Sequence, residues 1–199
     1  MDFRQIGLTG GIGSGKTTVA GLLIKSGYPV YFADESAKVI LDTDSEVKEK
    51  VKNLLGESVF QKDGTADRKK IASLVFSNPE LLKGLNAIIH PATFSDFEKW
   101  KMNLKSNSWV FKEAAILLEA GADQNLDAVL LIQAPLPLRL QRVCDRDQTT
   151  AEKVLERMAQ QWPEEKKVNK ADFIIYNDGV HPLEPQIEQA IEFFKQKFG

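Results

Sequence analysis

Eight residues near the N-terminus, Gly10–Thr17, match the phosphate-loop pattern G-x-x-x-x-G-K-[S/T]. An apolar run, Phe3–Leu8, precedes them and a helical pattern, Thr17–Ile24, follows them, which is the context that this loop requires. Glycines are needed because the loop turns its amide N–H groups inward, where side chains would block the phosphates. The alternative is a flexible glycine turn, and the agreement of both flanks argues against it. The pattern predicts a nucleoside triphosphate site and does not identify the acceptor.

Two side chains of the loop have expected roles of their own. The Lys16 ammonium is expected to reach the β- and γ-phosphates, and the Thr17 hydroxyl is expected to bind Mg²⁺. The residues predicted to bind the triphosphate are Gly11, Ile12, Gly13, Ser14, Gly15, Lys16, Thr17 and Thr18.

The charge balance excludes one class of partner. The chain has 199 residues, with 26 Lys and Arg against 28 Asp and Glu, so its formal net charge is −2. This total argues against a broad basic face for nucleic acid or an anionic membrane, and it allows a small anion site. Cys144 is the single cysteine, no apolar run is long enough to span a membrane, and no secretory signal is recognisable. We therefore expect a cytoplasmic protein with neither nucleic-acid nor membrane partners.

Short apolar runs alternate with helical patterns along the chain. This alternation indicates an α/β fold of three layers around a parallel sheet of about five strands. The expected strands are Phe3–Leu8, Tyr28–Ala33, Trp109–Phe111, Ala128–Ile132 and Phe173–Tyr176. Apolar residues at helical spacing between Leu183 and Phe198 predict a C-terminal amphipathic helix.

A long segment separates the second expected strand from the third. It has about seventy residues, too many for one crossover helix. One helix stopped by Gly56, one capped by Asp67 and one opening at Asn78-Pro79 predict a mostly helical insertion. We expect a single unit over residues 1–199, with a core at about 1–34, 106–134 and 170–199, a helical acceptor-binding insertion at about 35–105, and a lid at about 135–169.

Asp34 is expected to end the second strand, at the carboxyl edge where open α/β sheets place their ligands. A carboxylate at this edge can orient an acceptor hydroxyl and take its proton during phosphoryl transfer. The alternative is an N-cap for a helix that starts near Glu35, because Asp is a favoured capping residue. Position alone does not separate the two interpretations.

Arginines gather after the fourth expected strand. Arg139, Arg142 and Arg146 are spaced so that they share one helical face, directly after the loop Ala134–Pro137. Guanidinium groups suit a lid that closes over phosphates, since each offers bidentate donors and permanent charge. The alternative is a solvated helix whose arginines pair with Asp145 and Asp147. The phosphate loop earlier in the chain favours the lid.

An ordered set of short motifs resembles the dephospho-coenzyme A kinase family over nearly the whole chain. The set runs Ile6–Lys16, Ala33-Asp34, Asp67-Arg68, His90-Pro91, Leu117-Leu118-Glu119, Arg142, Arg146-Asp147, Arg157-Met158 and Ala171-Asp172 with Asn177. Many small-molecule kinases share the loop, whereas this ordered set is particular to one family. The resemblance implies a P-loop core, a helical substrate domain and a lid. It also implies phosphorylation of the ribose 3′-hydroxyl of dephospho-coenzyme A, with ATP and Mg²⁺, as the last step of coenzyme A synthesis.

The resemblance also implies roles for side chains outside the loop. Asp34 would activate the acceptor hydroxyl, with Lys16 and Arg142 as the other catalytic groups. Arg142 and Arg146 would contact the ATP phosphates from the lid, and Asn177 would lie near the adenine. The implied acceptor-binding residues are Asp34, Arg68, His90, Glu119 and Arg157.

Two of these residues have plain structural alternatives, and two positions depart from the family. His90, before Pro91, can cap the preceding helix, and Glu119 can be a surface residue at a helix end. Phe32 stands where the family commonly has a second Asp, so no paired carboxylate is expected beside Asp34. Ala115 stands where the family commonly has Pro.

Two other functions remain to be separated from this one. A kinase for another nucleotide or metabolite would share the loop and the lid. A GTPase-type switch would prefer guanine, and Asn169–Asp172 does match the guanine-reading pattern N-K-x-D. In GTPases that motif follows an apolar strand, whereas here the strand comes after it, so we interpret the match as coincidence.

Overall fold

The computed structural model describes residues 3–104 and 109–199. The chain forms two compact units, one of Met1–Tyr31 with Ser106–Gly199 and one of Phe32–Lys105, which we call unit 1 and unit 2. The predicted boundary between 105 and 106 lies outside the described residues. The division into core, insertion and lid stays a prediction.

Unit 1 is built on the five-stranded sheet, in which β2 (Val30–Phe32) reaches the boundary with unit 2. The strand order is β2-β3-β1-β4-β5, with β1 at Arg4–Gly10, β3 at Trp109–Glu113, β4 at Ala128–Gln133 and β5 at Phe173–Tyr176. The β1–β3, β1–β4 and β4–β5 pairs are parallel, which confirms the predicted α/β class. The middle of β4, Leu130–Ile132, is fully buried, as expected of a strand covered on both faces.

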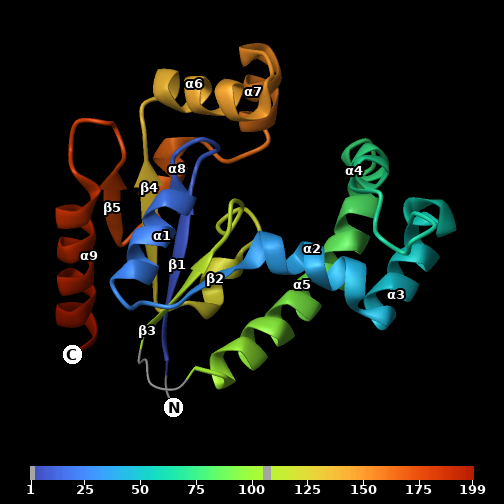
Figure 1. Cartoon of the computed structure of the whole chain (residues 1–199), viewed down its shortest axis with the longest axis horizontal. Coiled ribbons are helices and arrows are strands. Elements are labelled where there is room, and N and C mark those ends of the chain that lie inside the picture. The colour runs from blue at the N-terminus through green and yellow to red at the C-terminus, as the bar shows by residue number, and fades with distance from the viewer. Residues whose placement is uncertain (1–2, 105–108) are drawn as a thin grey trace. The chain divides into compact units, whose positions relative to one another are not determined.

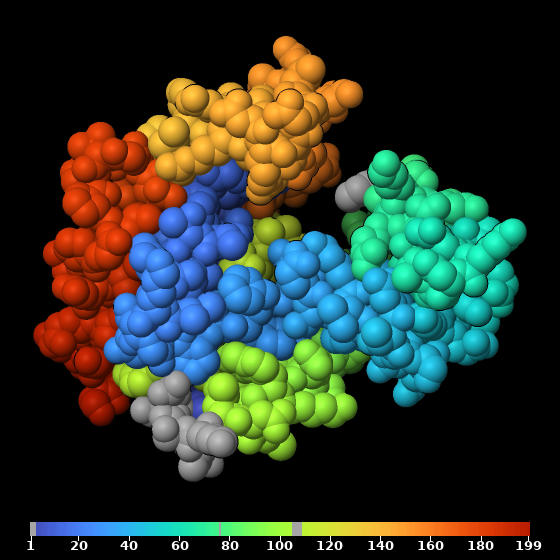
Figure 2. Space-filling view, viewed as in Figure 1, coloured from blue at the N-terminus to red at the C-terminus, as the bar shows by residue number. Residues whose placement is uncertain are grey.

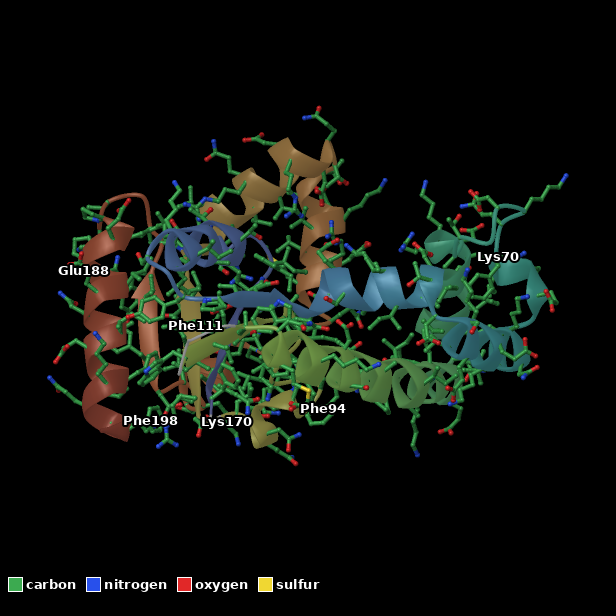
Figure 3. All side chains as sticks on the ribbon, turned by 60° about the horizontal axis from the view of Figure 1, so that its bottom comes forward. Lys70, Phe94, Phe111, Lys170, Glu188 and Phe198 are labelled. Atoms are coloured by element: carbon green, nitrogen blue, oxygen red, sulfur yellow. The ribbon has the colours of Figure 1, made fainter. Side chains whose placement is uncertain are left out.

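The helices of unit 1 follow the strands. They are α1 (Lys16–Lys25), α6 (Leu136–Asp147), α7 (Ala151–Met158), α8 (Glu164–Val168) and α9 (Leu183–Phe198), with a 3₁₀ turn at Ala122–Asn125. The C-terminal helix is confirmed: Ile187, Ile191 and Phe194 are buried, and Glu188 projects from its outer face (Figure 3). Figure 1 shows α6 and α7 beyond the carboxyl end of β4, at the end of the sheet that carries the β1–α1 loop.

Unit 2 is helical. It contains α2 (Ala33–Thr43), α3 (Ser45–Leu55), a 3₁₀ turn at Glu57–Val59, α4 (Arg68–Phe76) and α5 (Pro79–Met102). Its core joins Ile40, Leu41, Val47, Val51, Val59, Ala66, Ile71 and Val75. Asp67 and Asn78 cap α4 and α5 through their side-chain oxygens, and Lys70 in the first turn of α4 points away from the helices (Figure 3).

Two local predictions in unit 2 are wrong. Asp34 does not end the strand, because β2 stops at Phe32 and Asp34 lies in the first turn of α2, where a carboxylate complements the helix dipole. It is not the N-cap either, since that position is Phe32. His90 does not cap a helix, because α5 continues through His90 and Pro91. Packing of its apolar side chains against the unit 2 core outweighs the local preference of Pro for a helix start.

None of the helices formed by residues 3–104 and 109–199 combines the length and the apolar character needed to cross a membrane.

Candidate active site

The loop between β1 and α1 has a backbone that glycine makes possible. Gly13 and Gly15 have φ angles of 80° and 91°, in the left-handed region that side chains disfavour. Gly15 is the N-cap of α1, so the loop leads directly into the positive end of that helix. The Ser14 N–H donates to the Gly11 carbonyl at 3.0 Å, which closes the turn. This geometry fits an anion held by backbone amides.

The space around these glycines is as restricted as their backbone. A Cβ at Gly15 would lie closer than 3.0 Å to the Asn177 side-chain nitrogen, and a Cβ at Gly13 would lie 2.6 Å from the Arg139 carbonyl oxygen. The β1–α1 loop, which we call the phosphate cradle, therefore leaves no room for added side chains on the side of α6 and β5. Triphosphate binding at this loop fits the residues present.

The two charged or polar side chains expected to serve the phosphates begin α1. The Lys16 ammonium donates to the Gly10 carbonyl at 3.0 Å, so it folds back over the loop. Thr17 is exposed to solvent. Among the described residues no group of three or more His, Cys, Asp and Glu side chains could hold a metal ion. Magnesium does not need such a group, because it commonly takes one or two protein ligands together with substrate phosphates and water.

Asn177 and Arg142 meet at the loop. Asn177, buried after the end of β5, donates from its amide nitrogen to the Ser14 carbonyl at 2.8 Å. Arg142 of α6 donates to the Asn177 backbone carbonyl and side-chain oxygen, each at 3.2 Å. In the space-filling view the atoms of α6 lie against those of the segment that contains the β1–α1 loop (Figure 2). The structure thus brings Ser14, Gly15, Arg142 and Asn177 together.

The three arginines of the predicted lid face have three different environments. Arg139 is buried; its Nε donates to the Ile12 carbonyl at 2.9 Å, and its guanidinium pairs with Glu164 at 2.6 Å. Arg146 is exposed and pairs with Asp147 at 2.7 Å, as the solvated alternative predicts. Arg142, between them, adjoins the loop.

Asp147 also pairs with Arg157, at 2.6 Å. The hydrogen bonds from Arg146 and then Arg157 hold the pKa of the Asp147 carboxyl well below its usual range, and the same contact with Asp147 raises the pKa of Arg146. Arg146, predicted to contact the ATP phosphates, and Arg157, predicted to contact the acceptor, therefore share one carboxylate.

Glu119 is not the surface residue of the plain alternative. Its side chain is 13% exposed, and Oε1 lies 3.0 Å from Nζ of the fully buried Lys167. The same oxygen accepts from the Trp162 N–H at 3.0 Å. Glu119 thus fastens the segment between α7 and α8 to the segment after β3. Its predicted part in acceptor binding stays a prediction.

The other predicted acceptor residues belong to unit 2. Arg68, at the start of α4, forms an ion pair with Asp42 and donates to the Lys38 carbonyl at 3.3 Å. The Ala66 N–H, then Arg68, hold the pKa of Asp42 below its usual range. His90 is exposed on α5, and Asp34 is half-buried on α2.

Two residues beside the loop or its strand β1 are not predicted from the sequence. Gln161 accepts a hydrogen bond from the Ile12 N–H at 2.8 Å. Nothing in the sequence distinguishes this glutamine from one on the surface, so the contact could not be predicted. Glu113 ends β3, is buried, and is in register with Leu8 of β1. An acidic residue closing a strand beside the loop strand could have been noticed, because P-loop NTPases hold Mg²⁺ with such a residue.

Comparison with known proteins gives one consistent family. A family model described as dephospho-CoA kinase matches residues 4–182. A protein of that name from Chlorobaculum tepidum is 41% identical over 94% of this chain and 93% of its own length. One from Bacteroides fragilis is 37% identical over 97% of this chain and 94% of its own.

Solved structures agree with these matches. Protein TT1252 from Thermus thermophilus superposes with a TM-score of 0.86 at 37% identity, over the whole of both chains. The dephospho-CoA kinase from Campylobacter jejuni gives a TM-score of 0.69 at 29% identity, over 97% of this chain and 98% of its own. Shikimate kinase from Aquifex aeolicus, at 19% identity and a TM-score of 0.52, shares the fold.

Proposed function

Since the chain belongs to the dephospho-CoA kinase family, we propose that it transfers the γ-phosphoryl group of ATP to the ribose 3′-hydroxyl of dephospho-coenzyme A. The products are coenzyme A and ADP. The observation that carries the ATP half of this proposal is the β1–α1 loop, with its left-handed glycines at the start of α1. The identity of the acceptor rests on the family.

The phosphates are assigned to groups of unit 1. Backbone amides of Gly11–Thr18 surround them, and Lys16 leaves the Gly10 carbonyl to neutralise the charge that develops on the γ-phosphoryl oxygens. Arg142 supplies a second cation, since it adjoins Gly15 through Asn177. Asn177 lies near the adenine, and Arg146 contacts the phosphates after leaving Asp147.

Mg²⁺ is assigned to the Thr17 hydroxyl together with the phosphates, and Glu113, which is in register with Leu8 of β1, is assigned to assist. If bound there, the ion would supply positive charge that offsets part of the charge on the phosphates. The chain's own contribution there is to present a hydroxyl at the first turn of α1.

The acceptor is assigned to residues of unit 2, with Glu119 and Arg157 as further contacts. The Asp34 carboxylate accepts the proton of the 3′-hydroxyl as its oxygen attacks the γ-phosphorus. The bond from that phosphorus to the β–γ bridging oxygen breaks, and ADP leaves with the electron pair. Arg68 and His90, half-exposed and exposed, offer donors to the acceptor. The absence of a second Asp at Phe32 leaves Asp34 as the one carboxylate assigned to this step.

We also infer that the enzyme works in the cytoplasm and without a nucleic-acid partner. The inference is supported by the single cysteine, which suits a reducing compartment, and by the net charge of −2.

The test is a turnover assay with the product identified by mass. The purified chain is given ATP or GTP, Mg²⁺ and one acceptor at a time: dephospho-coenzyme A, AMP or adenosine. We expect ATP and dephospho-coenzyme A to give coenzyme A, and the Lys16→Ala variant to form it about 10³-fold more slowly. Phosphorylation of AMP or adenosine but never of dephospho-coenzyme A would refute the acceptor. A strong preference for GTP would instead favour a GTPase-type switch.

A further inference from the structure

Both backbone polar groups of Ile12, its N–H and its carbonyl, are held by side chains from far along the chain. The Ile12 N–H donates to Gln161 Oε1 at 2.8 Å, and the Ile12 carbonyl accepts from Arg139 Nε at 2.9 Å. Gly11 and Gly13 flank Ile12, so its neighbours impose little conformational restriction of their own. The two side chains supply that restriction.

Gln161 is itself anchored. Its amide nitrogen donates to the Ala115 carbonyl at 2.9 Å, so the side chain joins the loop after β1 to the segment after β3. The amide uses its oxygen as the acceptor and its nitrogen as the donor, which fixes its orientation. The next residue, Trp162, donates its N–H to Glu119, which also pairs with the buried Lys167. The side chain and the backbone at this point are therefore both fastened to one segment.

Arg139 is anchored from the other direction. Its side chain is 7% exposed and pairs with Glu164 at 2.6 Å. A Cβ on Gly11 would overlap this ion pair, so Arg139 and Glu164 pack directly on the loop. The Arg139 guanidinium, buried and paired with Glu164, therefore holds the backbone of the loop in place.

From these contacts we propose that Gln161 is a positioning residue of the ATP site. Gln161 holds the peptide group before the Ile12 Cα and Arg139 holds the one after it, so that together they fix the orientation of both. This arrangement directs the amides of Gly13–Lys16 toward the phosphates before ATP arrives. A loop that is already ordered loses less conformational entropy when it binds ATP. The proposal rests on the proposed function in one respect, that the ligand of the loop is ATP.

The experiment measures ATP-site affinity without turnover. A non-hydrolysable ATP analogue with Mg²⁺ is titrated calorimetrically into the parent, Gln161→Met and Gln161→Asn. Met keeps the length and removes both hydrogen bonds, whereas Asn keeps the amide and is one methylene too short to span both partners. Gln160→Met, at the exposed neighbouring glutamine, is the matched control. Urea unfolding and the affinity for dephospho-coenzyme A alone are measured on each variant.

We expect both Gln161 variants to bind the analogue about tenfold more weakly, a factor equivalent to about 1.4 kcal/mol and close to the net value of one or two hydrogen bonds. The Ile12 amide should exchange its hydrogen faster, while acceptor affinity and the control remain at parent values. If the folded variants bind the analogue as the parent does, the proposal is wrong. If affinity for both ligands falls together with stability, Gln161 is merely structural, which also refutes it. A parent that binds the analogue but does not phosphorylate dephospho-coenzyme A would contradict the proposed function alone.

Discussion

The polar side chains of the two units are organised differently. In unit 1 the phosphate loop is held by side chains from distant parts of the chain: Gln161 and Arg139 on Ile12, and Asn177 on Ser14. In unit 2 the residues assigned to the acceptor lie on helix surfaces; the Arg68 side chain is 45% exposed and His90 is exposed.

This contrast separates two ways of binding a charged ligand. A preformed cradle presents rigid amides and depends on many tertiary contacts, so small changes of shape should weaken nucleotide binding. A surface of exposed side chains depends on each side chain separately, so single substitutions there should change acceptor kinetics and leave the nucleotide unaffected. The predictions below test this division, beginning with the largest effect.

Lys16→Ala should lower kcat by about 10³-fold, because it removes a charge that is worth most in the transition state. Steady-state kinetics with both substrates saturating measure this loss, and circular dichroism checks that the variant is folded. A variant that turns over within a few-fold of the parent would contradict the assignment of the loop lysine.

Asp34→Asn should lower kcat by about 10²-fold or more and leave the KM values of both substrates close to those of the parent, because it removes the proton acceptor and keeps the shape. Glu35→Gln, the same change at the exposed neighbour in the first turn of α2, is the control. Parent-like turnover by Asp34→Asn would disprove its role as base.

Gly15→Ala should raise the KM for ATP by about tenfold or more, because φ is 91° and the new Cβ would meet Asn177. Gly21→Ala, within α1 and with no atom near its added Cβ, should instead stabilise the protein by about 0.5–1 kcal/mol. Urea unfolding and ATP kinetics on both variants measure the contrast. Equal effects at the two positions would mean that the cradle is less closely packed than its geometry indicates.

Arg68→Ala tests the surface side of the comparison. We expect the KM for dephospho-coenzyme A to rise several-fold and the KM for ATP to stay constant. Loss of the half-exposed ion pair with Asp42 should cost less than about 1 kcal/mol of unfolding free energy. An unchanged acceptor KM would restrict Arg68 to joining α4 to α2.

The smallest effect is expected at Asp147. Its pKa is lowered in the folded protein, so its pairing stabilises the fold fully above the unfolded pKa of about 3.9, and this stabilisation is lost as the pH falls toward the folded value. Asp147→Asn should therefore cost less than about 1 kcal/mol at neutral pH, and the difference from the parent should shrink below about pH 4. Urea unfolding across this range measures it. Asp145→Asn, which removes the same charge from α6, is the control.

Local signals predicted much of the fold. The ends of β5 and the caps at Asp67 and Asn78 were predicted correctly, because strand ends and caps depend on a few neighbouring residues. The sequence assigned Asp34 to the end of a strand and His90 to the end of a helix, whereas Asp34 lies in the first turn of α2 and His90 lies inside α5. The start of α2 and the passage of α5 through Pro91 depend on packing within unit 2, which outweighs local preference.

The nucleotide site likewise contains residues whose role could be predicted from the sequence and residues whose environment could not. Glycine spacing, Lys16 and Thr17 could be recognised from order alone, because a phosphate loop is a local backbone structure in which each residue type has one position. The environments of Arg139, Arg142 and Arg146 could not be predicted from the sequence. Helical spacing assigns all three to one face, and only the residues that pack against that face distinguish them. Folding buries Arg139 on Ile12, sets Arg142 against Asn177, and leaves Arg146 with Asp147 in solvent. Such contacts join residues more than a hundred positions apart in the case of Arg139 and Ile12, and the energy that selects them comes from burial and hydrogen bonding in three dimensions.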